Sequence, residues 1–312
     1  MEWHATRVSA VGKQSPSGRL LIGVRALPIF FLLIVVVSPA WGIDPVLNRG
    51  PGAEVLILTP VLELHQDGSG PVIIGGQPAI TDDYPVSLWF ETKNEKCTGF
   101  LIGARVLMTA AHCVSEGTLV KIKEDGGMAG IEGHCHRAPK FPSDPSQDLA
   151  LCSLTKDYPL PDIPGKPLTG YEVLNTDPSK LMKGNRVQIT GFGCTLEGGS
   201  LDNIYRVGWS KIDELPPKVP HAQCSIKIRG QSQLCKGDSG GPAFAIDKKS
   251  PSFRRVIGIN SKTSYTPGLV VGFLASTSTK DALDFFRNWA KEHDGQKICG
   301  VHKDAEDCRP TK

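Results

Sequence analysis

The stretch Gly-Asp-Ser-Gly-Gly-Pro at residues 237–242 constrains this chain more than any other feature. It sets Ser239 between glycines, which leave room for a substrate backbone and let main-chain N–H groups converge on one point. Such a loop suits a nucleophile beside an oxyanion-binding site. The same letters also fit Gly-x-Ser-x-Gly, the nucleophile elbow of a different fold. The residues upstream therefore decide between two architectures.

A histidine and an aspartate lie upstream in recognisable contexts. His112 follows an apolar run in Thr109-Ala-Ala-His-Cys113, and Asp148 opens the apolar segment Asp-Leu-Ala-Leu. Acyl transfer by serine needs a base of near-neutral pKa and a carboxylate that fixes the tautomer of that base. The order His112, Asp148, Ser239 excludes the elbow, in which the acid and the histidine follow the serine.

Short apolar runs separated by turn residues fill the chain from residue 73 onward, as in the expected hairpin of Phe100–Ile102 and Val106–Met108. This pattern predicts a β-sandwich or barrel. An esterase of the α/β-hydrolase type would need alternating helices and strands, which the sequence lacks. The proline-rich residues 157–180 are expected to connect two β units. A helix is predicted over 279–294, capped by Thr279.

The N-terminal residues 1–42 resemble a secretory signal. Basic residues precede the apolar stretch Ala26–Val37, and small residues follow it, with cleavage expected after Ala40 or Gly42. The apolar stretch is short for a membrane span, and an uncleaved anchor is the alternative. Residues 43–72, rich in Gly, Pro and Leu, show no core pattern and are expected to be a linker or propeptide.

Composition indicates the cellular compartment of the protein and the classes of partner that it can bind. All nine cysteines follow residue 96, and in an oxidising compartment they should form disulfides, which indicates a secreted or cell-envelope (periplasmic) protein. The net charge of +3 is too small to imply nucleic acid or an acidic membrane surface as a partner. His134-Cys135-His136 is the one candidate metal site, but no Cys-x-x-Cys spacing supports it. We expect no metal and no cofactor.

These motifs together resemble those of the chymotrypsin-like (trypsin-family, S1-type) serine proteases. The matching stretches are the mature N-terminus and the histidine, aspartate and serine motifs, here Ile73–Gly76, Thr109–Cys113, Asp148–Leu151 and Gly237–Pro242. The resemblance covers residues 73–294. It implies an all-β fold of two antiparallel six-stranded β-barrels, with a boundary near 165–180 and a C-terminal α-helix at 279–294. Residues 295–312 would form a polar tail with a disulfide loop.

The resemblance also implies roles for single residues. Ser239 would be the nucleophile, His112 the general base and then acid, and Asp148 the group that holds the imidazole. The N–H groups of Gly237 and Ser239 would form the oxyanion hole. The implied activity is that of a secreted serine endopeptidase acting through an acyl-enzyme. The alternative is a catalytically silent homologue that acts as a binding module.

Two departures from the family pattern concern activation and specificity. Asp238 would pair with the new α-amino group of Ile73, yet Val72 stands where a basic residue usually precedes the cut, so self-cleavage after Val72 is the hypothesis. Gln233 would form the floor of the S1 pocket, and its neutral side chain argues against a tryptic preference. Its expected walls are Ser261, Thr263 and Gly268, which narrow the pocket towards small or medium uncharged P1 residues.

Several disulfides are expected. Cys97–Cys113 is implied by the resemblance, Cys135 and Cys152 would be cross-strand neighbours, and Cys299–Cys308 would close a loop in the tail. By elimination Cys194 is assigned to Cys235, which leaves Cys224 unpaired. The expected partners are protein or peptide substrates and protein protease inhibitors. The mature chain is expected to be a monomer that binds neither nucleic acid nor membrane.

Overall fold

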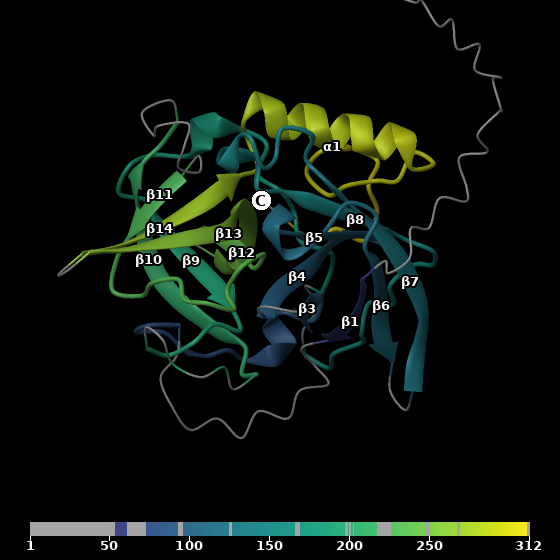
Figure 1. Cartoon of the computed structure of the whole chain (residues 1–312), viewed down its shortest axis with the longest axis horizontal. Helices are drawn as coiled ribbons and strands as arrows, with labels where there is room; N and C mark the ends of the chain where they lie inside the picture. Colours follow the sequence, from purple (N-terminus) through teal and green to yellow (C-terminus); the bar gives the residue numbers. More distant parts are fainter. Residues whose placement is uncertain are drawn as a thin grey trace, which may run out of the picture. The chain divides into compact units, whose positions relative to one another are not determined.

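The computed structural model describes residues 54–60, 73–92, 96–124, 127–165, 169–196, 199, 201, 203–216, 226–247, 250–266 and 269–310. The expected signal segment, Cys224 and Gly268 lie outside these residues. Within them, the chain forms two β-barrels followed by a C-terminal helix (Figure 1), which confirms the predicted fold. None of the helices in the described part is long and apolar enough to cross a membrane.

The first barrel closes in the order β1-β3-β4-β5-β8-β7-β6. The bounds are β1 Val55–Pro60, β3 Ser87–Glu91, β4 Lys96–Gly103, β5 Val106–Thr109, β6 Leu119–Glu124, β7 Gly127–Arg137 and β8 Ala150–Leu154. The predicted hairpin is β4–β5, where Phe100 lies opposite Met108. Every residue of β5 is buried, because this strand is covered on both faces.

Strand β1 corrects the expectation that residues 43–72 lack a core pattern. Val55–Pro60 pairs with both β3 and β6, and Leu56 and Leu58 are buried in the barrel. The segment Val-Leu-Ile-Leu-Thr-Pro is a continuous apolar run without clear alternation, and its glycine- and proline-rich surroundings gave it the composition of a linker. The first barrel therefore has seven strands among the described residues, one more than predicted.

The second barrel closes in the order β11-β14-β13-β12-β9-β10, and β10 pairs back with β11. The bounds are β9 Arg186–Gly191, β10 Arg206–Glu214, β11 Ile226–Arg229, β12 Pro242–Asp247, β13 Ser250–Thr266 and β14 Leu269–Ser276. The two-residue strand β2, Gln77–Pro78, extends the sheet beside β10. The expected barrel boundary near 165–180 falls in the connection from β8 to β9.

Helix α1, Lys280–Glu292, begins and ends within the predicted range. The Thr279 side chain accepts a 3.2 Å hydrogen bond from the Ala282 N–H, which satisfies one of the first-turn donors. Its apolar side chains lie on one face and join the core cluster of the first barrel: Ala282, Phe285, Phe286, Trp289 and Ala290. The helix therefore packs as the spacing of its apolar residues predicts.

Among the described residues there are four disulfides, Cys97–Cys113, Cys135–Cys152, Cys194–Cys235 and Cys299–Cys308. These are the four pairs expected from the sequence. Cys135 and Cys152 are register partners on the neighbouring strands β7 and β8. Together the four bonds cross-link segments within each barrel and within the C-terminal tail.

Candidate active site

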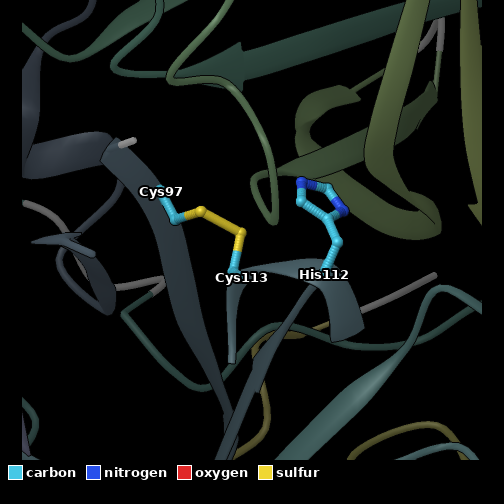
Figure 2. Close-up of side chains that lie close together, drawn as sticks. All are labelled: Cys97, His112 and Cys113. Carbon is cyan, nitrogen blue, oxygen red and sulfur yellow. A yellow bond between two sulfur atoms is a disulfide. The ribbon is translucent and has the colours of Figure 1, made fainter. Parts of the chain in front are cut away.

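The three triad candidates lie on loops at strand ends. His112 belongs to the short 3-10 turn Ala111–Cys113, which follows β5, and Asp148 is separated from the start of β8 by Leu149 alone. The Cys97–Cys113 disulfide ties the histidine turn to β4, as Figure 2 shows. Ser239 lies in the turn before β12 of the second barrel. The site thus draws on both barrels.

The histidine and the aspartate are in direct contact. The Nδ1 atom of His112 lies 2.7 Å from the Oδ2 atom of Asp148, and the backbone N–H of His112 donates to Oδ1 at 2.9 Å. The Asp148 side chain is 4% exposed, whereas that of His112 is 26% exposed. A buried carboxylate on Nδ1 keeps the proton on that nitrogen and makes Nε2 the basic one. The pair can therefore supply a fixed general base at the surface of the site.

Ser261 adds a third hydrogen bond to the same carboxylate. Its hydroxyl donates to the Oδ2 atom of Asp148 at 2.6 Å, across the boundary between the two barrels. The sequence placed Ser261 only in the wall of the S1 pocket, and nothing in the local pattern around it pointed to Asp148. Its contact with the acid arises only because β13 of the second barrel lies beside Asp148 of the first barrel in the folded protein.

The serine turn packs against strands β4 and β5 of the first barrel. The carbonyl of Ser239 accepts a 2.7 Å hydrogen bond from the Thr98 N–H. Gly240 has a φ of 82°, and a Cβ there would lie 2.2 Å from both the Thr98 carbonyl oxygen and the Thr109 hydroxyl. Only glycine fits so close to another backbone. The first glycine after the serine in the motif is thus explained by packing, with Ser239 itself half-buried.

Asp238 is enclosed behind the turn. Its two carboxylate oxygens each accept a 2.8 Å hydrogen bond, Oδ1 from the Gly193 N–H and Oδ2 from the Cys235 N–H. The residue is fully buried, and this burial raises the pKa of its carboxyl from 3.8 to about 7, although both hydrogen bonds and the charge of Arg206 act against the rise. A buried carboxylate of this kind is a ready partner for a cation.

Three of the expected S1 residues belong to the second barrel: Gln233 in the segment before Ser239, and Ser261 and Thr263 on β13. Gln233 pairs through its backbone with Ile74 at 3.0 Å. The hydroxyl of Thr263 donates to the Leu234 carbonyl at 3.1 Å, and the Tyr265 hydroxyl donates to the same oxygen at 3.2 Å. Side chains from β13 therefore reach across to the segment that precedes Ser239.

Gly272 lies opposite Thr263 in the pairing of β13 with β14. The register of β13 and β14 sets Thr263 against Gly272, where a Cβ would lie 2.8 Å from the Ile228 side chain. The predicted wall residue Gly268 falls outside the described residues. The sequence signal for Gly272 was its position in an apolar strand, where glycine usually marks a close approach.

One cluster of potential metal donors exists among the described residues, formed by Cys97, His112 and Cys113. Figure 2 shows that the two sulfur atoms are bonded to each other, so neither is the thiolate that a metal would require. The other candidate, His136, has its Nδ1 atom 2.7 Å from Glu116.

Comparison with known proteins places these features in a family. The family profile described as Trypsin matches residues 73–280. "Trypsin" of Phaedon cochleariae is 30% identical over 223 residues, which cover 62% of this chain and 80% of that protein. "Transmembrane protease serine 9" of Rattus norvegicus is 26% identical over 210 residues, or 62% of this chain and 20% of that protein. The chain thus spans a small part of the rat protein.

A solved structure, a mutant of human heparin binding protein (CAP37), has the same fold with a TM-score of 0.53. It is 19% identical, and the alignment covers 72% of this chain and 100% of that one. The matched residues 73–280 include every triad candidate and every strand of the two barrels except β1. The chain therefore belongs to the trypsin family of serine proteases.

Proposed function

We propose that this protein is a serine endopeptidase that cuts peptide bonds through an acyl-enzyme. The observation that carries this function is the buried Asp148 carboxylate, held by the ring and backbone of His112 and by Ser261. A silent homologue has no need to keep three hydrogen bonds on this acid. The family membership of the chain supports the same class of reaction.

The chemistry assigns one task to each group. As the Ser239 oxygen attacks the scissile carbonyl carbon, the Nε2 atom of His112 takes its proton. The N–H groups of Gly237 and Ser239 would receive the oxyanion, a contribution whose loss typically costs about 10²–10³ in kcat per donor. The imidazolium then gives its proton to the leaving amine, and water hydrolyses the ester by the reverse proton path.

The preferred P1 residue would be small or medium in size and uncharged. Gln233 carries no charge to bind lysine or arginine, and the Thr263 hydroxyl bridges to the carbonyl of Leu234. A side chain entering between these residues would meet the Thr263 side chain. Protein or peptide substrates with a short aliphatic P1 residue fit this arrangement best.

Maturation would occur by a cut between Val72 and Ile73. Ile73 has a φ of 53°, a left-handed conformation that costs a β-branched residue about 1–3 kcal/mol. A cut before Ile73 removes this strain, because an N-terminal residue has no preceding carbonyl. The side chain is fully buried in the core of the second barrel, and the new α-amino group would then neutralise the buried Asp238.

A disulfide-rich domain of this family is consistent with an extracellular location. Secretion through residues 1–42, a monomeric state and inhibition by protein inhibitors remain parts of the proposal.

A binding module without activity is the second candidate, and the contact of Thr263 with Leu234 is the observation that favours it. The deciding experiment purifies the secreted protein, reads its N-terminus and treats it with a serine-directed fluorophosphonate. The endopeptidase should be labelled, and Ser239→Ala should not. Protein that begins at Ile73 but stays unlabelled, while a known protease is labelled alongside it, would establish the binding module.

A further inference from the structure

Strand β1 is the element that closes the first barrel. It lies between β3 and β6, antiparallel to the former, with Leu58 opposite Phe90, and parallel to the latter, with Leu58 opposite Ile122. Strands β3 and β6 do not pair with each other in the described barrel. Without β1, both would become edges with a row of unpaired N–H and C=O groups.

The side chains of β1 belong to the core. Leu56 and Leu58 are 2% and 0% exposed and share one cluster with the buried residues of the other strands, whereas Val55 is 48% exposed. Removing a leucine from such a close-packed interior leaves a cavity that its neighbours fill only partly. Both the backbone and the side chains therefore hold this segment in place.

No disulfide can join β1 to the rest of the protein, because all nine cysteines follow residue 96. Its link to the second barrel is the backbone of residues 61–72, which leads to Ile73. The proposed maturation cut before Ile73 would sever that link. What becomes of β1 then depends on strand pairing and burial alone.

We propose that Val55–Pro60 stays in the barrel after the cut, so that the mature protein is a non-covalent pair of chains. One chain would end at Val72 and contribute β1, and the other would begin at Ile73. The slot between β3 and β6 acts as an acceptor for an added strand, and this fragment is its occupant. Because the pair arises only if the chain is cut, it rests on the maturation proposed above.

The test makes the cut without help from the protein's own activity. In the full chain, Ser239→Ala removes the nucleophile, and Ile-Glu-Gly-Arg replaces residues 69–72 so that factor Xa cuts before Ile73. The fragment should co-elute with the larger chain in equal amounts on size exclusion and separate only in denaturant. A fragment that elutes alone, while the larger chain keeps its folded circular dichroism, would overturn the proposal.

Variants on the buried and exposed sides of β1 test which side chains hold the fragment in the barrel. Leu58→Ala should raise the dissociation constant of the fragment about 30-fold or more, as expected for a truncated core leucine. Val55→Ala, on the exposed side of the same strand, should leave it unchanged. If Leu58→Ala does not fold before the cut, the smaller change Leu56→Val takes its place. It should also raise the dissociation constant of the fragment. Equal effects of the inner and outer variants would contradict a seat inside the barrel.

The N-terminal sequence of the unmodified secreted protein separates this inference from the proposed maturation. If no chain begins at Ile73, natural processing is wrong, but the result with factor Xa still decides whether β1 is retained. If a chain does begin at Ile73 and the purified native protein lacks residues 54–60, the cut is right and the retained strand is wrong.

Discussion

The backbone N–H of Cys235 donates a 2.8 Å hydrogen bond to the carboxylate of Asp238, three residues later. The other carboxylate oxygen accepts from Gly193, the neighbour of Cys194, and a disulfide joins Cys194 to Cys235. One covalent bond therefore spans the two donors that hold the acid beside Ser239. The turn that would form the oxyanion hole is braced before any cut is made.

Replacing both Cys194 and Cys235 by alanine should act mainly on kcat, with a smaller effect on the melting temperature. The loss of the bond lets the N–H groups of Gly193 and Cys235 drift apart, so that Asp238 no longer holds the turn that carries the oxyanion hole. Removal of one oxyanion-hole donor typically costs about 10²–10³-fold in kcat. Replacing Cys299 and Cys308, which close a loop in the tail, is the matched control. That pair should reduce the melting temperature and leave kcat/KM of the folded protein unchanged. Peptide hydrolysis and thermal unfolding of both double variants test this, and equal kcat losses would contradict the role.

The uncut protein should become less stable as the pH rises from about 4 to about 7. Burial raises the pKa of Asp238 to about 7, so between its unfolded value of 3.8 and that pH the native state binds more protons than the unfolded state. The slope contributed by this group approaches about 1.4 kcal/mol per pH unit. Urea unfolding at several pH values measures it.

Asp238→Asn should abolish this part of the slope, whereas Asp162→Asn, at an exposed position, should preserve it. Protein cut before Ile73 should also lose it, because the new α-amino group would keep the carboxylate ionised. A steep slope that persists in the cut protein would argue against the pairing of Ile73 with Asp238.

Thr263→Gly should widen the preference at P1. The change removes the hydroxyl that reaches the Leu234 carbonyl and leaves space opposite Gly272. Substrates with a larger apolar P1 residue should gain roughly 10-fold or more in kcat/KM relative to alanine or valine, since one or two methylenes in an apolar pocket differ by about 1–3 kcal/mol. A peptide library with varied P1 measures this ratio. Thr266→Gly, at an exposed position of the same strand, is the control.

The sequence predicts the parts of this protein that depend on local pattern. The contexts of His112 and Ser239 are short motifs, and the helix after Thr279 follows from a cap and a 3.6-residue period. Contacts between distant segments have no such signature. The insertion of β1 beside β6 depends on which barrel edge is open, and the contact of Ser261 with Asp148 depends on how the barrels meet.

A buried ion pair should prove costly to break. Glu172, in the connection between the barrels, is fully buried and bonded to Arg254 of β13 through Nε at 3.1 Å and through Nη2. Burial alone would raise the pKa of Glu172, but Arg254 and Arg309 outweigh it and lower the pKa overall. Arg254→Met nearly keeps the side-chain volume, removes the main partner of Glu172 and should cost about 3–5 kcal/mol in unfolding free energy.

The control is Lys291→Met, on the exposed face of α1, which should change the unfolding free energy by about 0.5 kcal/mol or less. A small effect of Arg254→Met in urea unfolding would mean that Arg309 suffices.

Ser261→Ala should slow the chemical step without weakening substrate binding. The Ser261 hydroxyl donates to the oxygen of Asp148 that also faces the His112 ring, so its loss loosens the carboxylate that orients the base. Hydrogen bonds to charged groups contribute about 1.5–3 kcal/mol, which corresponds to a fall in kcat of roughly 10-fold or more. KM should stay nearly constant, because Ser261 would act through Asp148 on the transition state. Ser264→Ala, exposed on the same strand, should leave both constants unchanged, and Ser261→Thr should restore part of kcat. A rise in KM at constant kcat would assign Ser261 to the S1 wall, as the sequence alone suggested.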